Sequence, residues 1–130
     1  MQIDNVKKAI QSLKKVSNDE KYSNFLDSLN FEESKAYLYV EAQRSNMFLK
    51  EIAAMKNISI SINDLKDKNK QKQIKDLIHN EEYIKNLINF WEMFGNSPAP
   101  SINLKKVIIE KYEKYYKPLA EIEKNFIIEC

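Results

Sequence analysis

The chain offers few side chains suited to catalytic or metal chemistry. His79 is the only histidine and Cys130 the only cysteine among its 130 residues. A metal site built on two histidines or on several cysteines needs more of these residues than the chain has. His79 stands beside Asn80 at a predicted break between helices, where a surface or capping role is usual. We predict no catalytic residue, no cofactor-binding residue and no metal ligand, and hence a protein that is not an enzyme.

Acidic residues are the remaining candidates for acid–base or metal chemistry. Carboxylates scattered along helices usually lie on solvated faces and pair with lysines one turn away. Glu41 and Arg44 differ, because they stand three residues apart in an apolar helix of a chain whose other cations are all lysine. A planar guanidinium suits a buried or interface pair, and an ordinary surface ion pair explains the spacing equally well. The other carboxylates considered are Glu32, Glu33, Glu51, Glu110 and Glu113.

Aromatic and methionine side chains indicate binding rather than catalysis. Such side chains anchor protein interfaces, although any one of them is more often part of a buried core. We predict a small non-enzymatic protein-binding module, such as an adaptor, an inhibitor or an immunity-type factor. Its partner would be another protein, or a second copy reached by helix packing. The interface candidates are Tyr37, Tyr39, Arg44, Met47, Phe48, Tyr112, Tyr115 and Tyr116.

One lysine-rich segment, residues 64–76, favours a different class of partner. Basic residues on one helical face contact phosphates. Three aspartates in the same segment dilute its charge, and the whole chain carries a net charge of only +2. A solvated helix face is therefore favoured over nucleic-acid binding for this segment. The candidates for nucleic-acid contact are Lys66, Lys68, Lys72 and Lys75.

A loop motif supports the same alternative. The run Phe94-Gly95-Asn96-Ser97-Pro98-Ala99 resembles the Phe-Gly-Leu-Thr-Pro-x-Ser-Arg signature that ends a helix in a group of phage terminase small subunits. Upstream, Tyr39-Val40-Glu41-Ala42 resembles a helical stretch of that group, so the resemblance covers about residues 29–104. It implies an oligomeric DNA-recognition subunit without catalysis of its own. Such a subunit is our alternative function.

Apolar periodicity predicts helices along almost the whole chain. Glycine occurs once, at Gly95, and proline three times, which disfavours hairpins and glycine-rich phosphate loops. From Ile3 onward, apolar residues recur every three or four positions, the period of a buried helical face. We predict an all-α fold, a single helical domain over 1–130 with about five to seven helices. Pro118 should kink or restart the last helix, and alternating Ile and Ser near residues 57–63 predict one short extended connector.

Hydropathy and cysteine content bear on location. No uncharged apolar run approaches the roughly 20 residues of a membrane span, and the N-terminal residues lack the apolar run of a signal peptide. One cysteine forms no disulfide within the chain. We predict a cytoplasmic protein with no membrane partner. Abundant Lys, Asn and Ile are typical of an AT-rich genome and fit a phage or mobile element of an AT-rich bacterium.

Overall fold

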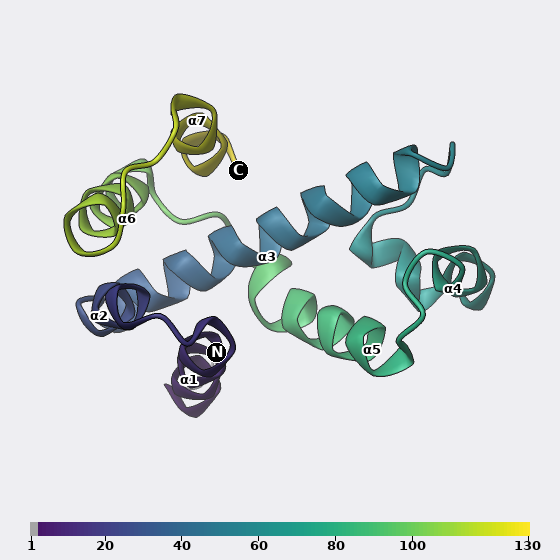
Figure 1. Cartoon of the computed structure of the whole chain (residues 1–130), viewed down its shortest axis with the longest axis horizontal. Helices are drawn as coiled ribbons and strands as arrows, with labels where there is room; N and C mark the ends of the chain where they lie inside the picture. The colour runs from purple at the N-terminus through teal and green to yellow at the C-terminus, as the bar shows by residue number, and fades with distance from the viewer. Residues whose placement is uncertain (1–2) are drawn as a thin grey trace. The chain divides into compact units, whose positions relative to one another are not determined.

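The computed structural model describes residues 3–130, and these form seven α-helices, a 3-10 turn and a π-helical turn, with no strand (Figure 1). The predicted all-α class and the predicted number of helices are confirmed. In chain order the elements are α1 (Ile3–Ser17), α2 (Glu20–Asp27), α3 (Phe31–Ala54), η1 (Ile62–Lys66), α4 (Lys68–Lys75), α5 (Glu81–Phe90), η2 (Trp91–Gly95), α6 (Ile102–Tyr115) and α7 (Glu121–Glu129).

Contacts divide the chain into two compact units. The terminal unit consists of the described residues up to Val40 together with Pro98–Cys130, and the central unit consists of Glu41–Ser97. The division falls inside α3, so this helix contributes one part of its length to each unit. A single folding domain over 1–130 stays a prediction.

A cluster of aromatic rings forms the centre of the terminal unit. Phe25 of α2 meets Tyr37 of α3 at 5.0 Å between ring centroids, and it meets Tyr112 of α6 at 5.1 Å, both edge to face. The ring of Tyr22 lies 5.2 Å from that of Tyr116, and its hydroxyl lies 2.6 Å from the hydroxyl of Tyr37. Edge-to-face pairs contribute about 0.5–1.5 kcal/mol each beyond the area they bury. Rings from α2, α3 and α6 therefore hold this core together.

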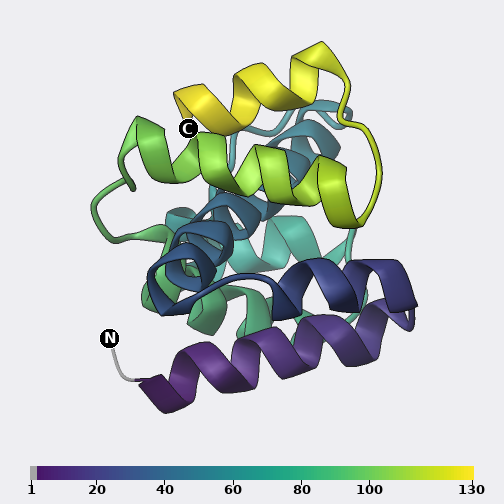
Figure 2. The ribbon, with the colours of Figure 1, turned by 90° about the vertical axis from the view of Figure 1, so that its left-hand side faces the viewer.

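Helices pair along the chain in the terminal unit. α1 lies beside α2, and α6 lies beside α7 (Figure 2). Pro118 falls among residues 116–120, which separate α6 from α7, so the chain restarts its helix there and does not merely kink. Lys105 of α6 is buried, and its ammonium donates to the carbonyl oxygens of Ile128 at 3.2 Å and Cys130 at 2.5 Å. A cation at the last carbonyls of a helix stabilises that end, so Lys105 fastens the end of α7 to α6.

In the central unit, amide side chains of α3 hold the segments that follow it. Gln43 Nε2 donates to the last carbonyl of η2 at 2.8 Å, and Asn46 Oδ1 accepts from the N–H of Ile62 at 3.0 Å. Asn63 Oδ1 then accepts the indole N–H of Trp91 at 2.8 Å. Each bond joins residues far apart in sequence, so η1 and η2 are both held against α3.

The Ile–Ser alternation after α3 is an extended connector. Residues 58–61 are neither helical nor paired in a sheet. Ile60 is buried and so is Ile62, the first residue of η1, whereas Ser59 is exposed. Alternate residues of an extended chain point to opposite sides. The chain therefore lays Ile60 and Ile62 into the core of the central unit, whereas Ile58 is only half-buried.

Asparagine, not glycine, makes the left-handed turns of this chain. Within residues 3–130 the positive φ angles belong to Asn18, at 48° after α1, and Asn57, at 58° after α3. Asparagine tolerates this conformation better than other residues with a side chain. Gly95 is the last residue of η2, but its φ is not positive. A Cβ there would lie 2.2 Å from Cε3 of Trp91, so glycine is needed to let the indole pack.

We expect Gly95→Ala to destabilise the central unit, because the added methyl group collides with the Trp91 ring. Overpacking of this kind costs about 1–3 kcal/mol. Chemical denaturation followed by Trp91 fluorescence measures the change. Asn96→Ala is the matched control, since Asn96 is the exposed neighbour, and it should change the free energy of unfolding by less than about 0.5 kcal/mol. Equal stability of the two variants would contradict the steric account.

Candidate functional site

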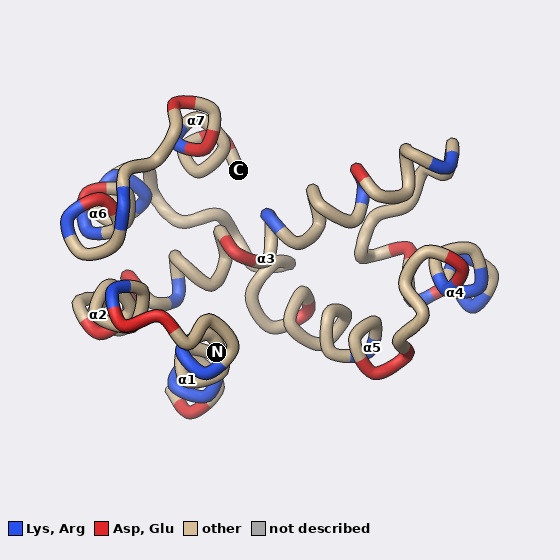
Figure 3. The backbone as a smooth tube through the Cα atoms, viewed as in Figure 1, with Lys and Arg blue, Asp and Glu red and all other residues tan. Residues whose placement is uncertain are grey.

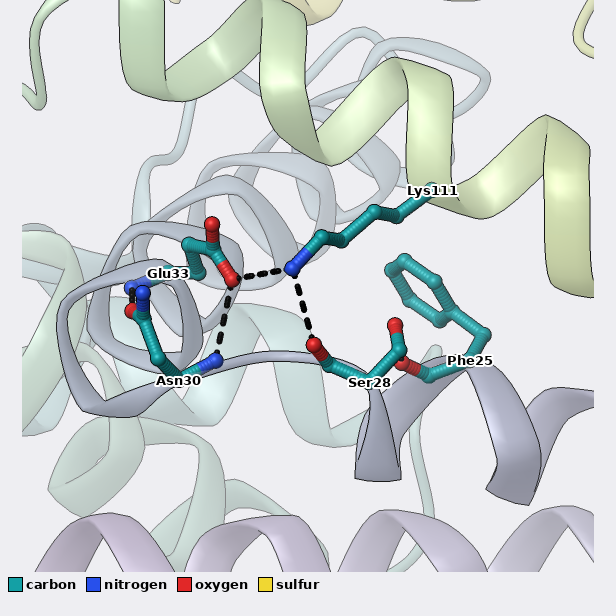
Figure 4. Close-up of polar contacts among 5 residues, drawn as sticks. All are labelled: Phe25, Ser28, Asn30, Glu33 and Lys111. Atoms are coloured by element: carbon teal, nitrogen blue, oxygen red, sulfur yellow. Dashed lines mark hydrogen bonds and ion pairs between the residues drawn. The ribbon is translucent and has the colours of Figure 1, made fainter.

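The best-defined polar cluster lies in the terminal unit and joins α6 to the start of α3 (Figure 4). Lys111 Nζ donates to Glu33 Oε1 at 2.7 Å and to the Ser28 carbonyl at 2.8 Å. Glu33 Oε1 also accepts from the N–H of Asn30 at 2.9 Å, and Asn30 Oδ1 accepts from the N–H of Glu33 at 2.9 Å. This reciprocal pair is the capping box expected from an Asn followed three residues later by a Glu.

The cluster stabilises the start of α3 and is poorly suited to acid–base catalysis. Burial opposes ionisation of Glu33, but the hydrogen bonds from Lys111 and Asn30 and the charge of Lys111 together lower its pKa below the ordinary 4.5. A carboxyl that stays ionised and accepts two donors is a poor general base. Among the described residues, no buried side-chain nitrogen or oxygen lacks a partner. The cluster therefore caps α3 and joins it to α6.

The only histidine and the only cysteine of the sequence belong to different units. His79 is exposed between α4 and α5 in the central unit, and Cys130 Sγ lies 3.2 Å from the Ile127 carbonyl in the terminal unit. Within residues 3–130, no three His, Cys, Asp or Glu side chains gather closely enough to hold a metal ion.

Two shallow grooves mark the surface of the units. One, of about 360 Å³, lies among α1, α2 and the start of α3, and its lining is mostly apolar, with Ile10, Leu26 and Phe31. The other, of about 280 Å³, lies between α4 and α5 and is lined by Lys75, Glu81 and their neighbours. Lys75 and Glu81 form an ion pair across it. Neither groove gathers the convergent polar groups of a small-molecule site.

The eight predicted interface residues fall into two groups. Tyr37 and Tyr112 are only 3% and 7% exposed and belong to the aromatic core, where ring packing outweighs any surface role. Tyr39 and Tyr116 are partly buried, and Tyr115 stands on the surface of α6. These five belong to the terminal unit. Arg44, Met47 and Phe48 belong to the central unit and share one face of α3.

That face forms a continuous strip, which we call the α3 strip: Arg44, Met47, Phe48, Glu51 and Met55. Met47, Phe48 and Met55 are 44%, 56% and 82% exposed. Met55 follows the last residue of α3, but its N–H bonds to the Glu51 carbonyl at 3.3 Å, so it keeps the helical register. Spacings of three and four residues put all five side chains on one face.

The strip lies opposite the side of α3 that packs. Ala42, Leu49 and Ala53 are at most 1% exposed, and their spacing places them together on the opposite face of the helix. Arg44 and Glu41 lie at one end of the strip, 3.8 Å apart and partly exposed, a surface ion pair and not a buried one. Glu51 and Met55 were not among the predicted interface residues, although their spacing from Phe48 indicates them.

Of the four lysines predicted to contact phosphate, two form ion pairs with carboxylates and two do not. Figure 3 shows basic residues concentrated on α4, with acidic residues close by. Lys66 pairs with Glu92 at 2.9 Å, and Lys75 pairs with Glu81. Lys68 and Lys72 are exposed and, among the residues that the structure describes, have no ion-pair partner. Of the predicted basic face, only these two lysines, both on the eight-residue helix α4, have no carboxylate partner among the described residues.

The chain matches no family model, and it has no significant match among curated proteins or solved structures. The resemblance of the Phe94–Ala99 loop to terminase small subunits therefore stays a prediction. Over residues 3–130, no helix combines the length and the apolar character that a membrane crossing requires.

We expect Lys111→Met to lower the free energy of unfolding at pH 7 by about 1–3 kcal/mol, because it leaves a buried carboxylate without its cation. Without Lys111, burial raises the pKa of Glu33 and the carboxyl takes up a proton on acidification. In the wild type the lowered pKa of Glu33 contributes stability above about pH 4.5, and this contribution is lost as pH falls through the folded-state value. The deficit of the variant should therefore shrink between pH 7 and pH 3.

Denaturation curves at both pH values test this, with Lys106→Met as control. Lys106 is exposed on the same helix, so its replacement should change stability by less than about 0.5 kcal/mol. If Lys111→Met lowers the free energy of unfolding equally at both pH values, the charge of Glu33 does not contribute to the loss of stability.

Proposed function

We propose that this chain is a non-enzymatic protein-binding module that engages its partner through the α3 strip. The observation that carries the proposal is the exposure of Met47, Phe48 and Met55 on one helical face. Single exposed apolar residues are ordinary on protein surfaces. Three within about two turns of one helical face form a patch of the kind that marks an interaction site.

The composition of the strip supports this function. An exposed phenylalanine supplies a large, stiff contact area, and flanking methionines adapt their shape to the partner surface. The helix beneath is held by Gln43 and Asn46 through their long-range hydrogen bonds. A surface presented on a rigid helix loses little conformational entropy on binding. Elsewhere in residues 3–130, an element carries at most two exposed large apolar side chains, whereas Met47 and Phe48 of α3 are joined by Met55, which continues the helical register.

DNA binding by an oligomer is the second candidate, and one observation favours it. Lys68 and Lys72 are exposed one turn apart on α4 with no ion-pair partner in the described chain. The pairing of Lys66 and Lys75 with carboxylates weakens the field that would attract phosphate. Salt-sensitive retardation of a DNA duplex that Lys68→Glu with Lys72→Glu abolishes would favour this function over protein binding.

We expect a photo-crosslinking phenylalanine analogue in place of Phe48 to capture a protein partner in the source cells. The same analogue in place of Tyr83 is the matched control, because Tyr83 is an aromatic residue of the central unit with comparable exposure, 44%. The captured protein is then purified and its Kd measured. Phe48→Asp should weaken binding by at least ten-fold, since a central aromatic anchor contributes about 2 kcal/mol or more.

Tyr83→Asp should leave the Kd within about two-fold of the wild type. Both substitutions alter exposed side chains, so both variants should keep the helical circular dichroism of the wild type. Equal capture at the two positions, or a captured protein whose affinity ignores Phe48→Asp, would contradict a binding role for the α3 strip.

A further inference from the structure

We propose that Met47 and Met55 are sites of reversible oxidation, and that their conversion to sulfoxides releases the partner of the α3 strip. The inference rests on the proposed function and adds a means of regulating it. A methionine sulfoxide is polar where the thioether is apolar, and this change disrupts methionine-rich interfaces. The strip therefore binds its partner in the reduced form only.

Thioethers make up most of the exposed apolar surface of the strip. Met47 is 44% exposed and Met55 is 82% exposed, so an oxidant in solution reaches both side chains. Met55 follows Met47 by eight residues, about 12 Å along the helix. Phe48 is the third apolar side chain of the strip, and peroxides do not oxidise a phenyl ring readily. Oxidation therefore changes both ends of the apolar surface and leaves its aromatic anchor intact.

Oxidation on this face penalises the complex and not the fold. The contacts that hold this part of α3 lie on its opposite face, at Ala42, Leu49 and Ala53. In the free chain the new sulfoxide oxygens of Met47 and Met55 stay in water. On binding they must lose that water, and a polar group buried without a hydrogen-bond partner is costly. The oxidised chain should therefore stay folded and bind weakly.

The oxidant we invoke is a peroxide, and the reaction balances between the two reactants. The thioether sulfur attacks one peroxide oxygen, so that an S–O bond forms as the O–O bond breaks. The proton of the transferred hydroxyl passes to the departing hydroxide, which leaves as water. Sulfur loses two electrons and the peroxide gains them. Methionine sulfoxide reductases return the thioether with electrons from a dithiol, which makes the change reversible.

Met93 is the matched control for reactivity. It is a methionine of the same unit, it lies on η2 and off the strip, and its exposure of 40% is close to that of Met47. Peptide mass spectrometry of the full chain in hydrogen peroxide should show Met55 oxidised about twice as fast as Met93, in line with their exposed fractions. Bound partner should slow oxidation of Met47 and Met55 and leave that of Met93 unchanged, because it covers only the strip.

The Kd of the partner captured through Phe48 tests the release. Peroxide should raise this Kd by at least about ten-fold, with unchanged circular dichroism, and a methionine sulfoxide reductase should restore it. A dithiol added after the peroxide reduces any sulfenic acid or disulfide at Cys130 before the measurement. Met47→Leu with Met55→Leu should bind within about three-fold of the wild type and keep that Kd after peroxide. Met93→Leu should lose affinity as the wild type does.

Three results would overturn the regulation and leave the proposed function standing, since the partner would still depend on Phe48. In the first, the oxidised wild type binds as tightly as the reduced protein. In the second, Met55 reacts no faster than Met93. In the third, the variant with leucine at both Met47 and Met55 still loses its partner in peroxide. An affinity that ignores Phe48→Asp would instead remove the proposed function and the regulation together.

Discussion

The packing of both units depends on α3, whose surroundings change near residue 41. Ala36, Tyr37, Leu38 and Val40 are all buried, so the helix is covered on most sides in the terminal unit. After Glu41 the fully buried residues of α3 all lie on one face, which consists of Ala42, Leu49 and Ala53. A helix that is apolar all round must be covered all round. The part of α3 that follows Glu41 is buried on one face only. Its opposite face is exposed and carries the α3 strip.

Polar side chains fix the neighbours of α3 in both units. In the terminal unit the Lys111 ammonium bridges the Glu33 carboxylate and the Ser28 carbonyl. In the central unit Gln43 and Asn46 reach η2 and η1. Each net hydrogen bond contributes only about 1 kcal/mol, but an unmade buried one costs more. Their main effect is therefore specificity, since alternative packings would leave these groups without partners.

The near absence of glycine shapes how this chain turns. Asn18 and Asn57 take the left-handed conformations that follow α1 and α3, and Pro118 stands between α6 and α7. The one glycine serves the Trp91 ring instead of a turn. Glycine is the residue with the most conformational freedom in the unfolded chain. Connections that contain asparagine and proline in its place are therefore less flexible. Helical surfaces such as the α3 strip are then presented in one geometry.

The sequence by itself determined the helices and most of their limits, because apolar periodicity, asparagine and proline act locally. The Asn30 and Glu33 spacing is that of a capping box, which the structure forms. Of the three isoleucines in the Ile–Ser stretch, Ile60 and Ile62 are buried and Ile58 is only half-buried. The sequence did not show which aromatic residues lie on the surface and which lie in the core. Tyr37 and Tyr112 have the same helical periodicity as exposed anchors would have, and only the packing of α2 and α6 placed them around Phe25. Likewise, the open face of α3 between Arg44 and Met55 follows from which neighbours fold against its other side. Local spacing says which residues share a face, whereas contacts between distant segments decide which face is covered.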